Sequence, residues 1–202
     1  MSPSDVLDAE AIQAACAGQL IGHRVVAFDE VRSTNESTAE MAPGAAEGLV
    51  VFAERQTAGR GQYGRRWESA AGKGLWMSVL LRPGIGVAES SRLTDLLAQT
   101  IAATIGETVG GAARIKPPND VYIGSRKVAG VLVEMRVEMG GGYCAIAGMG
   151  INVSHAPDDF PTELREIATS LALAAGCAPN RQAFAIALLR ALEVRYAALR
   201  AA

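Results

Sequence analysis

Three consecutive glycines, Gly140, Gly141 and Gly142, join two strand-like segments, and this junction constrains the fold more than any other feature of the chain. The segment before it, 127–138, alternates well enough for a long strand, and 143–153 follows as a second one. A glycine turn between two such segments predicts a β-hairpin, whose strands pair antiparallel. The sheet is therefore expected to be mainly antiparallel and not a doubly wound parallel one.

Other periodic segments add helices and strands to this hairpin. Apolar residues at every fourth position from Leu93 to Ile105 predict a helix over 90–108, which Gly110 and Gly111 end. Further strands are expected at 24–28, 49–54, 75–81, 113–116 and 121–123. Further helices are expected from Ser4 or Asp5 to Gly18 or Gly22, at 36–41, and after Asn180. Together they predict one α+β domain over 1–202.

The composition is that of an ordinary globular protein. The 202 residues are long enough to bury a sizeable core, half of them are hydrophobic, and the net charge of −2 predicts no binding of nucleic acid or membrane. Cys16, Cys144 and Cys177 are scattered, and the histidines are His23 and His155, so neither a zinc site nor a disulfide scaffold is expected. Buried reduced thiols and the absence of a leader-like segment predict a cytoplasmic protein.

A run of glycines and arginines over 55–67, closed by a tryptophan, carries the most specific chemical signal. Glycine N–H groups form a concave nest, and arginine matches a carboxylate or phosphate with two parallel hydrogen bonds. The preceding segment, 48–54, has the pattern of a buried strand, so a rigid element would position this loop. The run predicts an anion-binding loop, and a solvated basic turn is the alternative.

Two better-known phosphate-binding patterns are excluded for this run. The spacing of Gly59, Gly61 and Gly64 matches the dinucleotide fingerprint, but no apolar helix follows and the next strand has no acid at its end. The P-loop pattern fails because Arg65 and Arg66 stand where Lys and Ser or Thr are required.

Two further segments combine polar side chains with the ends of elements. Ser33, Thr34 and Asn35 suit either a small polar ligand or a helix N-cap. The segment 148–152 has two glycines that permit close approach to the backbone, with Asn152 to read a polar edge, or else it forms a strand-end turn.

The segment 116–120 precedes a lysine at the start of an apolar strand. Lys127 must either extend outward to solvent or pair with a buried anion. Asn119 and Asp120 suit either a turn or oxygen ligands for a metal-bound phosphate.

Taken in order, from residue 33 to residue 152, these segments resemble the catalytic domain of biotin protein ligases. The matching pieces are Ser33-Thr-Asn35, Gln56-Thr-Ala-Gly-Arg-Gly-Gln-Tyr-Gly-Arg-Arg-Trp67, Lys116-Pro-Pro-Asn-Asp120, Arg126-Lys-Val-Ala-Gly-Val-Leu-Val-Glu134 and Gly148-Met-Gly-Ile-Asn152. The combination is far more specific than any single piece.

The resemblance implies a fold similar to class II aminoacyl-tRNA synthetases, with a mixed sheet flanked by helices. It implies that biotin and ATP form biotinyl-adenylate with Mg²⁺, and that biotin passes to a lysine of a biotin carboxyl carrier protein. The biotin-binding residues it implies are Ser33, Thr34, Asn35, Gln56, Arg60, Gly61, Gln62 and Lys127. Those for ATP are Gly59, Arg65, Asn119, Asp120 and Asn152, with Asp120 also for the metal. Lys127, Arg60 and Asp120 would be catalytic.

The chain departs from the family pattern at several points. Gln62 stands where the family usually has arginine, and Pro117 where it usually has tryptophan. Neither an N-terminal winged helix before Ser33 nor a small C-terminal β-domain is expected, and the protein is expected to be a monomer or homodimer. A lipoyl or octanoyl transferase of the same fold and a catalytically degenerate biotin-binding module are the alternative functions.

Overall fold

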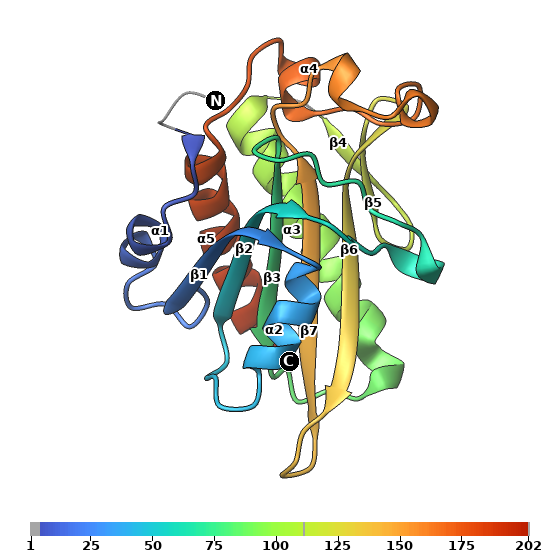
Figure 1. Ribbon diagram of the computed structural model, residues 1–202. Helices are drawn as coiled ribbons and strands as arrows, with labels where there is room; N and C mark the ends of the chain where they lie inside the picture. The colour runs from blue at the N-terminus through green and yellow to red at the C-terminus, as the bar shows by residue number, and fades with distance from the viewer. Residues whose placement is uncertain (1–4, 111, 202) are drawn as a thin grey trace.

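The computed structural model describes residues 5–110 and 112–201, whose strands form one seven-stranded sheet in the order β1-β2-β3-β7-β6-β5-β4 (Figure 1). The strands are β1 (Arg24–Val31), β2 (Leu49–Gln56), β3 (Gly74–Leu81), β4 (Ala113–Lys116), β5 (Asp120–Ile123), β6 (Arg126–Val137) and β7 (Tyr143–Asn152). Only β1 and β2 pair parallel among them; the other neighbours pair antiparallel. The predicted α+β fold with a mixed, mainly antiparallel sheet is confirmed.

Helices cover both faces of the sheet. The long helices α3 (Ser90–Val109) and α5 (Arg181–Arg200) lie on one face, and α2 (Thr34–Met41) lies on the other (Figure 1). The short helices α1 (Ala9–Ala15) and α4 (Leu171–Ala175) are the remaining α-helices of the described residues. No helix of that chain has the length and apolarity that crossing a bilayer would need. The central strands β2, β3 and β7 are therefore mostly buried, whereas the edge strands β1 and β4 remain largely exposed.

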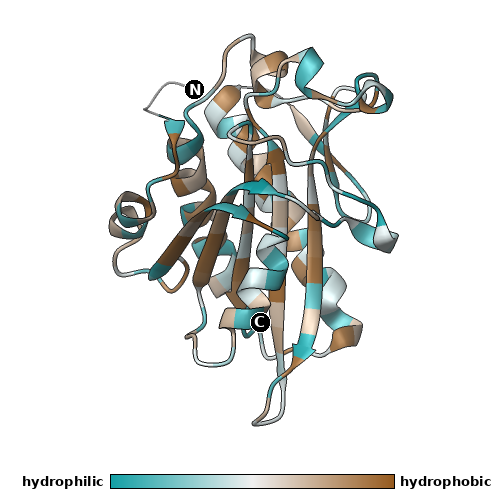
Figure 2. Cartoon of the chain, viewed as in Figure 1, coloured by the Kyte–Doolittle hydropathy of each residue, from teal (hydrophilic) through white to brown (hydrophobic). Residues whose placement is uncertain are grey.

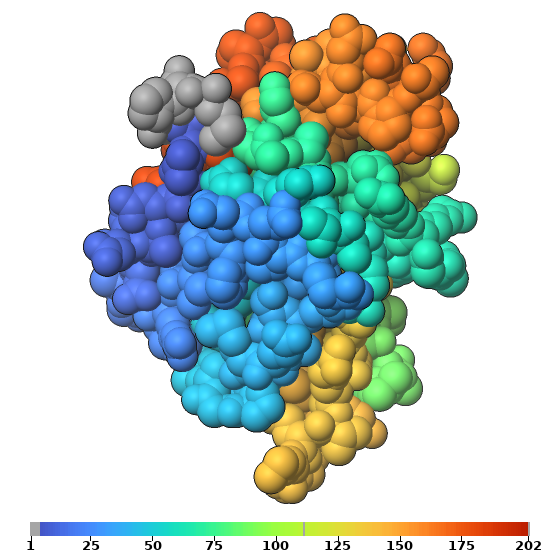
Figure 3. Space-filling view, viewed as in Figure 1, coloured from blue at the N-terminus to red at the C-terminus, as the bar shows by residue number. Residues whose placement is uncertain are grey.

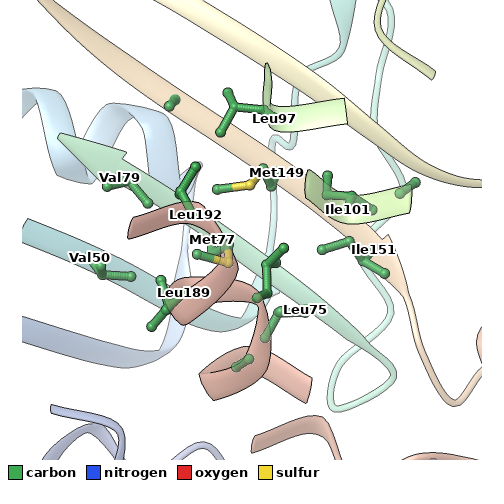
Figure 4. Close-up of a cluster of buried hydrophobic side chains, with 14 of the residues drawn as sticks. Val50, Leu75, Met77, Val79, Leu97, Ile101, Met149, Ile151, Leu189 and Leu192 are labelled. Carbon is green, nitrogen blue, oxygen red and sulfur yellow. The ribbon is translucent and has the colours of Figure 1, made fainter. Parts of the chain in front are cut away.

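Alternate side chains of the central strands supply two separate cores. Met77 on β3 and Ile151 on β7 pack with Ile101 of α3 and Leu189 of α5 (Figure 4). The opposite face buries Leu49, Val51, Leu80 and Ile146 beneath the end of α2. Every residue of β3 is buried as a result, and hydrophobic residues dominate β2 and β3 in Figure 2, whereas β6 also carries hydrophilic positions.

The N-terminal helix is shorter than predicted. Asp8 caps its first turn by accepting a hydrogen bond from the Ala11 N–H, so α1 begins at Ala9 and ends at Ala15. Asp5 does not begin α1, and its carboxylate pairs instead with Arg181; Ser4 lies outside the described residues. The helix α3 ends at Gly110, which adopts φ 70°, whereas Gly111 is not described.

One further sequence expectation needs correction, and one buried charge was not anticipated. Cys177 is exposed, while Cys16 and Cys144 are buried as expected. Arg181, the first residue of α5, is fully buried, and its guanidinium donates to Asp5, to the Glu54 carboxylate and to the Gly74 carbonyl. This buried arginine ties the start of α5 to the ends of β2 and β3.

Candidate functional site

A cavity of about 750 Å³ lies where the loop after β2, the start of α2, strands β5 to β7 and the segment after β7 meet. Its size is that of a small-molecule site. At the surface, the loop (teal to green) and the segment after β7 (orange) lie next to each other in Figure 3. The predicted site residues that line the cavity are Ser33, Thr34, Asn35, Gln56, Arg60, Gly61, Gln62, Arg65, Asn119, Asp120, Lys127 and Asn152.

The glycine–arginine loop is folded back on itself as a narrow hairpin. The Gly61 N–H donates to the Arg65 carbonyl at 2.7 Å, and the Trp67 N–H donates to the Gly59 carbonyl at 2.9 Å. A Cβ at Gly59 would lie 2.6 Å from the Trp67 carbonyl oxygen, so glycine is needed for this closure. Gly59 therefore shapes the loop and is not among the residues that line the cavity.

Gly148 and Gly150 lie within β7, so the alternative of a strand-end turn is wrong. A Cβ at Gly150 would stand 2.6 Å from the Trp67 indole, and one at Gly148 would stand 2.3 Å from Asn35 Oδ1. The two glycines thus permit the close approach to the β7 backbone that the sequence predicted, and the approaching groups are the Trp67 and Asn35 side chains. Trp67 is the aromatic wall of the cavity that sequence reasoning did not assign.

The segment 33–35 forms the start of α2, where Ser33 is the N-cap residue without a capping side-chain bond. The Thr34 N–H donates to Gln56 Oε1 at 2.9 Å. Asn35 donates from Nδ2 to Glu134 Oε2 at 2.7 Å, and its Oδ1 lies 2.6 Å from Ser78 Oγ. The Asn35 amide is therefore engaged within the protein at both ends.

Lys127 pairs with an anion and does not extend outward. Its Nζ lies 2.6 Å from Asp120 Oδ1, with the two side chains 28% and 21% exposed, and 5.0 Å from the centre of the Trp67 ring. The Lys127 backbone also binds the segment after β7, through Ile167 and Thr169. The ammonium group is thus placed between the carboxylate, the aromatic wall and the far side of the cavity.

Two predicted nucleotide residues use their amide nitrogens to hold neighbouring backbone. Asn119 Nδ2 donates to the Val131 carbonyl at 2.9 Å, and Asn152 Nδ2 donates to the Thr169 carbonyl at 3.0 Å. Both side chains are buried at the cavity wall. These bonds orient both amide groups, so their oxygen atoms have defined positions.

The segment after β7 contributes lining residues that sequence reasoning missed. The buried His155 ring stacks on Phe160 at 4.8 Å between ring centres and meets Trp76 edge-on at 5.8 Å. Burial lowers the pKa of His155 to about 4. The Asp159 carboxylate opposes this shift, the Lys73 charge adds to it, and a hydrogen bond with the Lys73 backbone acts to raise the pKa. The only sequence signal here was a histidine and an aromatic residue in a segment without periodicity.

A family model described as the biotin/lipoate A/B protein ligase family matches residues 27–152. The bifunctional ligase/repressor BirA of Bacillus subtilis (strain 168) is 41% identical over 179 residues, which are 88% of this chain and 55% of that protein. The biotin–[acetyl-CoA-carboxylase] ligase of Mycobacterium tuberculosis is 33% identical over 83% of this chain and 63% of its own length. The chain spans about half the length of the curated relatives it matches.

Solved structures agree with these matches. The biotin protein ligase from Aquifex aeolicus in complex with biotin and ATP superimposes with a TM-score of 0.78 and 30% identity, over 88% of this chain and 72% of that one. The ligase from Leishmania major in complex with biotinyl-5-AMP has a TM-score of 0.73 at 24% identity, which is a likeness of fold.

Proposed function

The chain belongs to the biotin/lipoate A/B protein ligase family, and we propose that it activates biotin with ATP and transfers the biotin to a lysine of a biotin carboxyl carrier protein. The observation that carries this proposal is the position of Lys127. Its ammonium group lies in a ligand-sized cavity next to Asp120 and Trp67, with the glycine–arginine loop on the same cavity wall.

In the first step, an oxygen of the biotin carboxylate attacks the α-phosphorus of ATP, the bond to the bridging oxygen breaks, and pyrophosphate leaves. Two anions must meet for this reaction, so it needs cations and N–H donors more than a nucleophilic side chain. Lys127 and Arg60 both line the cavity and supply that charge. Lys127 would stabilise the negative charge that grows on the phosphate as the new bond forms.

The biotin end of the cavity is assigned to the α2 side. Ser33, Thr34 and Gln56 would face the ring system, with Gly61 and Gln62 of the loop. Asn35 belongs to the same group, but its amide is engaged by Glu134 and Ser78, so we assign it to holding this wall in place. The nucleotide end is assigned to Asn119, Asp120, Asn152 and Arg65, with Gly59 shaping the loop.

Magnesium belongs to the same proposal. Mg²⁺ in phosphate-transfer sites is bound by one or two carboxylates together with substrate phosphates and water. The Asp120 carboxylate and the neighbouring Asn119 amide at the cavity wall are oxygen donors of the required kind. Bound there, the ion would neutralise phosphate charge. Asp120 would then divide its charge between the ion and Lys127.

In the second step, the amine of the carrier lysine attacks the acyl carbon of the adenylate, an amide forms and AMP leaves. The cavity mouth between the loop and the segment after β7 is the entrance for that lysine. Cytoplasmic location is part of the proposal, because ATP and the carrier must reach the same cavity.

Biotin-dependent exchange of pyrophosphate into ATP tests the first step directly. We expect exchange with saturating ATP, magnesium and biotin, and far less with lipoate or octanoate in place of biotin. Exchange that responds to lipoate and not to biotin would assign the chain to the lipoyl branch of the family. No exchange with any of these acids would contradict the proposal.

A further inference from the structure

Glu134 of β6 receives hydrogen bonds from two separate cavity-lining segments on a single oxygen atom. Asn35 Nδ2, from α2, lies 2.7 Å from Glu134 Oε2, and Arg60 Nη2, from the glycine–arginine loop, lies 3.1 Å from the same atom. The Glu134 and Arg60 side chains are 24% and 39% exposed. One carboxylate thus joins α2 to the loop.

The Asn35 end of this contact is rigid. Asn35 is buried, its side chain occupies the space left by Gly148, and its Oδ1 lies 2.6 Å from Ser78 Oγ. An amide oxygen only accepts, so Ser78 donates its one proton to it, and the Asn35 nitrogen must face Glu134. The Glu134 carboxylate is therefore oriented from the protein interior before it meets Arg60.

The same polar network reaches the other end of the loop. Ser78 Oγ lies 2.7 Å from Thr34 Oγ1, and Thr34 in turn binds Gln56. Gln56 Nε2 donates to Ser69 Oγ at 3.0 Å. The network therefore starts at Arg60 and ends at Ser69, and the glycine-rich part of the loop lies between these two attachments.

Arg60 is the weakly held member of this network. It is partly exposed and stands on a loop with several glycines. Ordering the Arg60 side chain costs conformational entropy, because the side chain loses rotamer freedom. A charge-assisted hydrogen bond to a fixed carboxylate offsets that loss, and it is roughly twice as strong as a neutral one.

We propose that Glu134 is a positioning residue that holds Arg60 at the cavity wall and attaches the glycine–arginine loop to α2 before the ligand binds. The Arg60 guanidinium is then already oriented when an anionic ligand arrives. Glu134 itself is kept from repelling that anion, because its charge is shared between Arg60 and the Asn35 amide. The assignment of the anion to biotin or ATP rests on the proposed function, whereas the attachment of the loop does not.

Limited proteolysis with trypsin tests the attachment of the loop to α2 and does not depend on the protein's own activity. Trypsin cleaves after Arg60, Arg65 and Arg66 within the loop. We expect Glu134→Gln to raise the initial cleavage rate at these bonds several-fold in the ligand-free protein. The neutral amide still accepts from Asn35 but binds the guanidinium less strongly. Mass analysis of the first fragments identifies the cleaved bonds.

Glu138→Gln is the matched control. Glu138 follows on the chain just beyond β6 and pairs with Arg82 at 2.7 Å, so the same substitution removes an ion pair outside the cavity. We expect this control to leave cleavage of the loop unchanged. Equal cleavage of the loop in the Glu134 and Glu138 variants would overturn the proposal.

Arg60→Gln breaks the same contact from its partly exposed side. This variant is the alternative test if Glu134→Gln does not fold. It should raise cleavage after Arg65 and Arg66. Where both single variants fold, adding Glu134→Gln to it should have no further effect. Additive effects would show that the two residues act independently, which would contradict the proposal.

Kinetics supply a second readout for the same variants. If Glu134 orients Arg60 toward biotin, Glu134→Gln should raise the KM for biotin by about tenfold, near the lower end for one charge-assisted contact, and change kcat less. Wild-type protein without exchange activity would contradict the proposed function, while the trypsin result would still decide the role of Glu134.

Discussion

The Lys127 ammonium group lies 2.6 Å from the Asp120 carboxylate, although the two residues are not opposite each other on β5 and β6. Asp120 pairs with Gly130, and the register of the strands shifts between Val121 and Tyr122. A Cβ at Gly130 would stand 3.2 Å from Lys127 Nζ, so the lysine side chain lies across the glycine to reach the carboxylate. The bulge and the glycine together aim Lys127 into the cavity.

Lys127→Ala should raise the barrier for adenylation by about 2–4 kcal/mol, which is the usual effect of losing one oriented donor to developing charge. Single-turnover formation of the adenylate measures this rate. Lys116→Ala, which removes an exposed lysine of β4, is the control and should have little effect. A Lys127 variant that reacts at the wild-type rate would show that the lysine is not catalytic.

Gln62→Arg should slow release of the adenylate by several-fold. Gln62 begins the turn of the loop and lines the cavity, where a neutral side chain gives a weaker bond to an anion than arginine does, by about 1 kcal/mol. The dissociation rate of biotinyl-adenylate checks this. Ala71→Arg adds the same charge at an exposed position after the loop and controls for general attraction. Equal dissociation rates in wild type and Gln62→Arg would place this side chain away from the ligand.

Gly150→Ala should displace the Trp67 indole and lower the free energy of unfolding by about 1 kcal/mol, the low end for overpacking, because both residues are only partly buried. The reason is the 2.6 Å separation between the added Cβ and the ring. Denaturant unfolding gives the free energy, and tryptophan fluorescence reports the moved ring. Gly140→Ala has no heavy atom within 4 Å of its added Cβ and should leave both unchanged. Unaltered fluorescence in Gly150→Ala would contradict this packing.

His155 should make the folded protein less stable in mild acid. Its pKa is about 4 in the folded state, chiefly because of burial, and 6.5 in the unfolded chain. Between these values the unfolded state binds the proton and the folded state does not, so stability is full above pH 6.5 and falls as the pH drops toward 4. The loss attributable to this group is about 3 kcal/mol at its limit.

Denaturant unfolding between pH 4 and pH 7 measures that slope. His155→Phe keeps an aromatic ring against Phe160 and removes the titration, so its stability should depend less on pH in this range. His23→Phe removes the exposed histidine and should keep the wild-type slope. An unchanged slope in His155→Phe would assign the acid sensitivity to other groups.

Prediction from the sequence succeeded where the signal is local. The glycine hairpin after Val137, the four-residue periodicity of α3 and the alternation along β6 each lie within one element, and the structure has all three close to the expected bounds. The first helix was predicted too long, because Asp8 and not Asp5 supplies the cap.

The amino-acid sequence by itself determined the local shapes of this protein, which are strands with buried patterns, a glycine-rich loop that folds back, and glycines where side chains come close. Only the tertiary structure decided which distant groups meet. Arg60 and Glu134 are 74 positions apart, and Arg181 reaches a Glu54 that is 127 positions away. A charged residue has the same neighbours in sequence whether it is solvated or buried, and its partner is selected only when the sheet brings the two segments together.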